Sequence, residues 1–180
     1  DRVILMMETR YEWLVSDLAI LSCGALTIPI YPNLPSGQIA HPLAEARPKA
    51  AIVSRPELLG RLLRAPGAAE QLRVVFLLDG APPDAAPAPV RSLRALLDGP
   101  APAPVEEDDL GRIRETVKKT DPATVLYTSG TSSTPKGVVL RHESILSNVR
   151  MVSQCLPFDS TDRYLSILPL APTIERTVQY

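Results

Sequence analysis

The first 80 residues alternate between short apolar runs and segments with helical spacing, and this alternation limits the possible folds most strongly. Residues 3–7 form a continuous apolar run, which is typical of a parallel strand covered on both faces. In the next segment, Trp13, Leu14, Leu18 and Leu21 recur at helical spacing. The further strand-like ranges are 25–30, 50–53 and 73–78, and the further helical ranges are 35–45 and 56–64. Because the connections are short, we expect an α/β fold with a parallel or mixed sheet and helices on both faces.

A proline-rich segment separates this first part from the rest of the chain. Residues 81–104 contain seven prolines, each of which removes a backbone donor and disfavours helix at the preceding residue. We interpret the segment as an exposed excursion within the domain, with a short helix at residues 92–97. A docking site for a proline-binding partner is the alternative interpretation.

The region after the prolines shows a second set of alternating signals. Helical ranges are expected at 106–119 and 142–156, and strands at 123–127, 137–140 and 164–168. We therefore divide the chain into first β/α units at 1–80, the excursion at 81–104 and a further strand and helix region at 105–180.

Composition excludes several classes of function. The formal net charge is −1, from 19 basic and 20 acidic residues, so we expect no nucleic-acid partner. The 45% apolar and 22% charged residues fit a soluble globular chain. The longest apolar run, residues 18–30, is interrupted by polar and proline residues and is too short to span a bilayer. With no recognisable signal peptide, we expect a cytoplasmic location.

The two cysteines point to no metal cluster. Cys23 and Cys155 lie far apart in apolar, helix-like stretches, and no Cys-x-x-Cys pattern occurs. We expect both to be buried thiols in a reducing compartment.

The segment between Tyr127 and Val138 has the strongest chemical signal. Between residues 128 and 134 only Gly130 lacks a side-chain hydroxyl, and Lys136 follows. Hydroxyls and converging backbone amides donate hydrogen bonds to phosphate oxygens, and the lysine adds a compact positive charge. The segment therefore suits a polyphosphate, although a Ser/Thr-rich surface turn is the plainer interpretation of its composition. A Walker A loop is excluded because a proline precedes the lysine and a glycine follows it.

The same segment resembles the phosphate-binding signature of the adenylate-forming superfamily, which includes acyl-CoA synthetases, luciferases and peptide-synthetase adenylation domains. The usual form is Tyr-Thr-Ser-Gly-Thr-Thr-Gly-x-Pro-Lys-Gly-Val, of which this chain keeps nine positions; Ser132 retains the hydroxyl, whereas Ser133 replaces the second glycine. The early residues, with Trp13 and residues 29–32, resemble bacterial long-chain fatty acyl-CoA synthetases. Residues 168–176 resemble the next motif of that group, except that Ala-Pro stands in place of Ser-His.

The resemblance implies part of the large N-terminal domain of a long-chain fatty acid–CoA ligase. Such a ligase activates a fatty acid as acyl-AMP and then transfers the acyl group to CoA. The resemblance therefore implies that the parent enzyme, the longer protein that would contain this chain, uses ATP, Mg²⁺ and CoA. Its implied phosphate ligands are Thr128, Ser129, Gly130, Thr131, Ser132 and Lys136. It implies no catalytic residue and no metal ligand within this chain.

The family's adenine, ribose and C-terminal lid motifs do not occur in these residues, so we interpret the chain as a fragment. We expect it to be inactive alone, to bind none of these cofactors stably, and to self-associate through unpaired strand edges. Two alternatives stay open: a fatty acyl-AMP ligase that loads a carrier protein, and a non-catalytic relic or interaction module, favoured by Ser133 and Pro172. Peripheral membrane association of the parent also stays open.

Five other residues have structural interpretations that we prefer to functional ones. We expect Trp13 to lie in the core, His41 on the surface, and Asp121 in a turn before a strand. His142 is expected to start a helix rather than act as a general base, and Glu175 to form a salt bridge with a nearby arginine.

Overall fold

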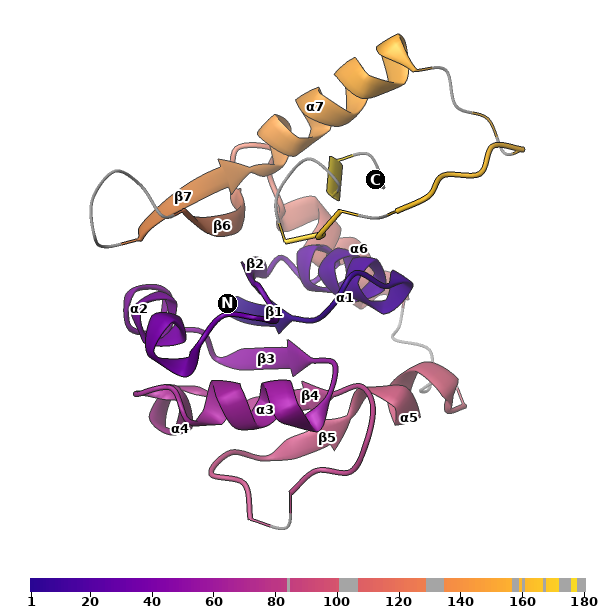
Figure 1. The fold of residues 1–180 in the computed structure, drawn as a ribbon. Coiled ribbons are helices and arrows are strands. Elements are labelled where there is room, and N and C mark those ends of the chain that lie inside the picture. Colours follow the sequence, from indigo (N-terminus) through magenta and orange to yellow (C-terminus); the bar gives the residue numbers. More distant parts are fainter. Residues whose placement is uncertain are drawn as a thin grey trace.

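The computed structural model describes residues 1–83, 85–100, 107–128, 135–156, 159, 161–166, 168–171 and 176–177. These residues build a seven-stranded sheet in the order β5-β4-β3-β1-β2-β6-β7, with helices on both faces (Figure 1). The six strands from β5 to β6 in this order run parallel to one another. The last strand, β7, is antiparallel to β6. The expected α/β class with a mixed sheet is confirmed.

The strands follow the apolar runs of the sequence closely. They are β1 (Arg2–Met6), β2 (Leu26–Ile30), β3 (Ala50–Val53), β4 (Val74–Leu77), β5 (Val90–Ser92), β6 (Pro122–Thr128) and β7 (Lys136–Arg141). The helices are α1 (Tyr11–Ser22), α2 (Ser36–Ala46), α3 (Pro56–Leu63), α4 (Ala68–Gln71), α5 (Leu93–Asp98), α6 (Glu107–Thr116) and α7 (His142–Cys155). Strand β5 and helix α4 were not predicted from the sequence.

Two apolar layers cover the two faces of the sheet. Because side chains alternate along a strand, Ile4 and Met6 of β1 enter one layer and Leu5 enters the other. The first layer packs against α2, α3 and α4, and the second contains Trp13 of α1. Trp13 is fully buried, as expected. The central strands are therefore covered on both faces, which explains their continuous apolar runs.

Two expectations about the last part of the chain were wrong. Residues 164–166 and 168 form no strand; Tyr164 and Leu165 are 52% and 78% exposed, so this apolar run packs into neither layer. Cys23 and Cys155 are exposed, because the first follows the end of α1 and the second is the last residue of α7.

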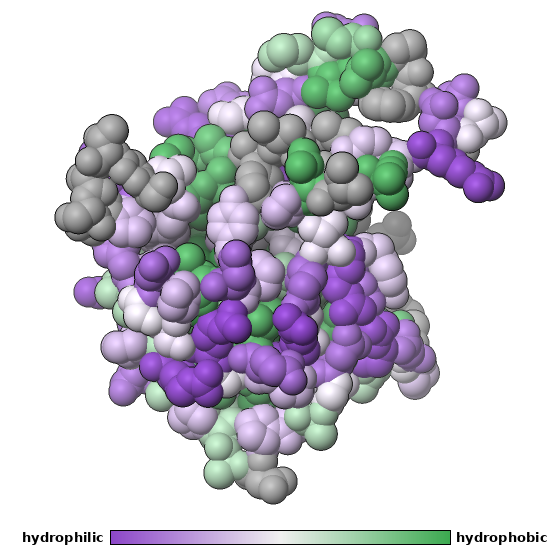
Figure 2. All heavy atoms as spheres, in the orientation of Figure 1, coloured by the Kyte–Doolittle hydropathy of each residue, from purple (hydrophilic) through white to green (hydrophobic). Residues whose placement is uncertain are grey.

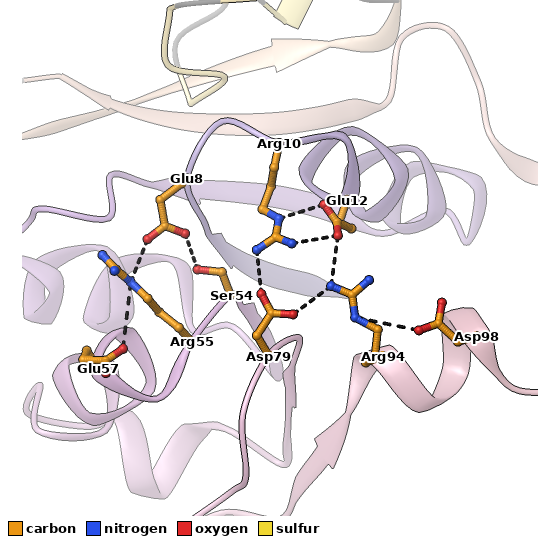
Figure 3. Close-up of polar contacts among 9 residues, drawn as sticks. All are labelled: Glu8, Arg10, Glu12, Ser54, Arg55, Glu57, Asp79, Arg94 and Asp98. Carbon is orange, nitrogen blue, oxygen red and sulfur yellow. Dashed lines mark hydrogen bonds and ion pairs between the residues drawn. The ribbon is translucent and has the colours of Figure 1, made fainter.

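An ionic network in two neighbouring parts joins the segment after β1 to those after β3 and β4 and to α5 (Figure 3). Arg10 contacts Glu12 and Asp79, each at 2.7 Å, and Arg94 contacts the same two carboxylates at 3.1 and 2.7 Å. Glu12 is buried, so its charge depends on both arginines. Beside it, Glu8 accepts a hydrogen bond from Ser54 and pairs with Arg55. Each carboxylate of this network faces a donor, and we interpret the network as structural.

The network predicts a loss of stability in acid. The hydrogen bond from Arg10 lowers the pKa of Glu12, and those from Arg94 and Arg10 lower the pKa of Asp79, from ordinary values of 4.5 and 3.8. A lowered pKa stabilises the folded chain fully above the ordinary value, and this contribution is lost as the pH falls through the folded-state pKa. We expect Glu12→Gln to lower the free energy of unfolding by about 1–3 kcal/mol at pH 7. In denaturant titrations the difference from wild type should shrink below pH 4.5; a difference independent of pH would contradict this.

Candidate functional site

The hairpin of β6 and β7 brings the two ends of the Ser/Thr-rich segment together. Thr128, the last residue of β6, lies directly opposite Lys136, the first residue of β7. Both residues are exposed, and opposed residues of an antiparallel pair project from the same face. Ser129, Gly130, Thr131, Ser132 and also Ser133 lie outside the described residues. Of the six expected phosphate ligands, the structure therefore places two, and it places them side by side.

A pocket of about 390 Å³ opens at this end of the hairpin. Its lining comes from the carboxyl ends of β2 and β6 and from α2, and includes Tyr31, Leu34, Gln38, Thr128 and Pro135. In open α/β sheets, ligands bind outside the carboxyl ends of the parallel strands. The described part of the Ser/Thr-rich segment therefore lies where the fold class places ligands.

Helix α2 contacts the base of the segment. His41 Nε2 lies 2.8 Å from the carbonyl oxygen of Pro135, and the His41 ring meets the edge of Tyr127 with ring centroids 5.8 Å apart. Burial and a hydrogen bond to Glu45 raise the pKa of Tyr127, so its hydroxyl stays protonated at neutral pH. His41 was expected on the surface, but it is half-buried against the hairpin.

Gly137 allows the hairpin and α2 to approach closely. A Cβ at this position would lie 3.1 Å from Val125 Cγ1, 3.3 Å from Tyr127 Cε1 and 3.4 Å from Glu45 Oε2. The first two distances are tighter than ordinary van der Waals contact, and the third lies at its lower limit. The glycine after Lys136 is thus explained by packing on the α2 side of the hairpin.

The remaining candidates lie away from this site. His142 begins α7, as expected, and its backbone N–H donates to the Asp121 carbonyl oxygen at 3.2 Å. Burial, together with the charge of Arg176, lowers the pKa of His142. Asp121 is a turn residue whose carboxylate accepts from the Lys118 N–H, also as expected. Because the six residues of β7 extend over about 17 Å from Lys136 to Arg141, His142 lies at the opposite end of this strand and belongs to another part of the fold.

The described part of the motif at residues 168–176 contacts α1 and the loop before it. Thr9 Oγ1 donates to the Leu168 carbonyl oxygen, and Leu170 is buried in the layer that contains Trp13. Arg176 forms a buried, two-pronged pair with Asp17 of α1, with both nitrogen–oxygen distances 2.7 Å. Pro172 and Glu175 lie outside the described residues.

Two further findings concern metals and membranes. Among the described residues, no group of three or more His, Cys, Asp or Glu side chains could hold a metal ion. We therefore assign Mg²⁺ no ligand among these residues. No helix in the described ranges has the length and apolar character needed to cross a membrane.

Comparison with known proteins gives the family. The sequence profile of the AMP-binding enzymes matches residues 1–180, so the chain belongs to this family. It is 31% identical over 180 residues to the long-chain-fatty-acid–CoA ligase FadD15 of Mycobacterium bovis, covering 99% of this chain and 28% of that protein. It is 26% identical to the chloroplastic long-chain-fatty-acid–[acyl-carrier-protein] ligase AEE15 of Arabidopsis thaliana, over 100% of this chain and 26% of that protein.

A solved structure supports the fold. The inhibitor-bound N-terminal domain of FACL13 from Mycobacterium tuberculosis superimposes with a TM-score of 0.74 at 24% identity, covering 98% of this chain and 40% of that one. The fold is that of N-terminal domains of acyl-CoA synthetase-like enzymes. The chain spans between a quarter and a third of the length of the two curated relatives named above.

Proposed function

We propose that this chain is the part of a long-chain fatty acid–CoA ligase that binds the phosphates of ATP. The observation that supports it is the pairing of Lys136 with Thr128, a residue that lines the pocket. In the proposal these two residues, with Ser129, Gly130, Thr131 and Ser132, bind the β- and γ-phosphates and the departing pyrophosphate. The lysine contributes charge and the others donate hydrogen bonds, so their role is positioning and charge stabilisation.

The proposed parent reaction has two steps. The fatty acid carboxylate attacks the α-phosphate of ATP, which forms acyl-AMP and releases pyrophosphate; the thiolate of CoA then attacks the acyl carbon and releases AMP. The likeness to an acyl-carrier-protein ligase favours a second candidate, in which a carrier-protein thiol replaces CoA. The first step is common to both candidates.

An exchange assay tests the proposal. In the whole protein that contains this chain, we expect ATP–pyrophosphate exchange that depends on long-chain fatty acid and is lost in Lys136→Ala. The 180-residue chain alone should give no exchange, because we propose that the reaction also needs residues outside it. Exchange by the 180-residue chain would overturn that part of the proposal. Whole protein that folds and shows no fatty-acid-dependent exchange would overturn the assignment itself. Product formation with CoA or with a carrier protein then separates the two candidates.

We also expect the 180-residue chain to self-associate. Within the described residues β7 pairs only with β6, and Val138 and Val139, which alternate across the strand, are 43% and 55% exposed. Hydrophobic side chains also gather over α7 at the top of the molecule (Figure 2). An open apolar edge of this kind promotes pairing between chains.

Light scattering at tens of micromolar provides the measurement. Val139→Lys should shift the chain toward monomer, because charge on an edge strand opposes pairing. Leu96→Lys, at a 57% exposed site on α5, is the matched control and should leave association unchanged. A clean monomer for the wild-type chain would contradict the expectation.

A further inference from the structure

His41 contacts the hairpin at the residue next to Lys136. It lies on α2, 94 residues before Pro135 in the sequence, yet its Nε2 is 2.8 Å from the Pro135 carbonyl oxygen. Its ring packs nearly perpendicular to Tyr127, at an interplanar angle of 85°. One side chain thus contacts β6 and the residue that directly precedes β7, at the end where Thr128 and Lys136 face each other.

We propose that His41 is a positioning residue for the phosphate site: it donates a hydrogen bond from Nε2 to the Pro135 carbonyl and so fixes the start of β7, from which Lys136 projects. This inference rests on the proposed function, because it assigns His41 a role in the same site. It assigns no contact between His41 and the nucleotide. His41 acts through the backbone at Pro135.

The chemistry of the partners determines the direction of the hydrogen bond. A carbonyl oxygen accepts only, so the Nε2 that faces it must bear the proton. Glu45, one helical turn further along α2, places Oε2 3.5 Å from the same nitrogen and also accepts a hydrogen bond from Tyr127. Glu45 therefore favours the same Nε2–H form and joins α2 to β6 as well.

The geometry of α2 explains why this contact serves the site. Gln38 and Pro42, four residues apart, line the pocket, while His41 and Glu45, also four residues apart, meet the hairpin. Positions with this spacing share a helix face. One helix therefore supplies a wall of the pocket and, through His41, the contact to the residue that precedes Lys136.

The test compares two substitutions of His41. His41→Leu removes the donor, whereas His41→Gln keeps an N–H at about the same distance from the backbone. We expect Leu to weaken binding of magnesium pyrophosphate about five- to tenfold, as for one lost hydrogen bond, and to speed amide hydrogen exchange at residues 136–138. Gln should restore both toward wild type, while the thermal unfolding midpoints of the two variants stay similar. Ala44→Leu, on the exposed face of the same helix, is the matched control and should change neither quantity.

The outcomes distinguish this inference from the proposed function. If His41→Leu binds magnesium pyrophosphate and exchanges its amide hydrogens as wild type does, the positioning role is overturned. A His41→Gln variant as impaired as His41→Leu would also overturn it. If the folded wild-type chain binds no pyrophosphate, the proposed function fails. Amide hydrogen exchange at residues 136–138 then still decides whether His41 fixes the start of β7.

Discussion

Replacing Arg176 with methionine is expected to lower the free energy of unfolding by about 3–5 kcal/mol, because it removes a buried guanidinium that forms two hydrogen bonds with a buried carboxylate. Asp17 is fully buried and Arg176 is 1% exposed. The Arg176 guanidinium donates from Nε and Nη2 to the two oxygens of Asp17, both at 2.7 Å. Thr27 Oγ1 also donates to Asp17 at 2.6 Å, but a neutral hydroxyl cannot balance the charge.

The position of the pair increases its structural effect. It joins α1 to a segment 159 residues further along the chain, and the guanidinium lies over the Trp13 ring at 5.6 Å. Methionine retains apolar volume beside the tryptophan, so the substitution tests mainly the charge. Loss of the pair should therefore release the segment around Leu170 from the layer that contains Trp13.

Urea unfolding measures this effect, and an exposed pair provides the control. Arg141 pairs with Glu143 at 3.3 Å, with both side chains about half exposed, so Arg141→Met should cost at most about 1 kcal/mol. Adding Asp17→Asn to Arg176→Met should recover part of the loss, because the buried charge is then removed. A loss below about 1 kcal/mol for Arg176→Met would contradict the assigned role of the pair.

Lys136→Ala is expected to weaken binding of magnesium ATP by at least about tenfold, since a charge-assisted contact to phosphate is worth about 1.5–3 kcal/mol. Lys136 is exposed at the first position of β7, so its removal should leave the fold intact. Lys118→Ala removes the same charge from an exposed position in the turn before β6 and should bind as wild type does. Lys136→Arg retains the charge but not the compact ammonium and should bind with intermediate affinity.

Titration by calorimetry or by amide chemical shifts tests this prediction. Equal weakening in Lys136→Ala and Lys118→Ala would show that net charge, and not this site, governs the affinity. Wild-type affinity in Lys136→Ala would remove the lysine from the proposed site.

The sequence predicted the central strands well because these strands are buried on both faces. Residues 3–7 and 50–53 form continuous apolar runs, and β1 and β3 begin and end within a residue of them. Strand β5 was missed because Val90 is its only apolar residue and Pro89 directly precedes it. The strand expected at residues 164–168 was wrong for the opposite reason: the run is apolar, but Tyr164, Leu165 and Leu168 are exposed and do not join the sheet.

The candidate site was predictable only in its local part. The Ser/Thr-rich segment and Lys136 are adjacent in sequence, so their pattern could be recognised. The contact of His41 with Pro135 and the pairing of Arg176 with Asp17 join residues 94 and 159 positions apart. Periodicity and spacing contain no signal for such contacts, because the crossovers of the sheet create them.

One titration tests the central claim most directly: magnesium pyrophosphate and magnesium ATP added separately to the folded wild-type chain. If Thr128, Lys136 and the residues between them bind phosphates, both compounds should bind saturably at one site with similar, weak affinity, near 1 mM or about −4 kcal/mol. Similar affinities are expected because the proposed contacts reach only the phosphates. A folded chain that binds neither compound would contradict the claim, and so would a chain that binds ATP far more tightly than pyrophosphate.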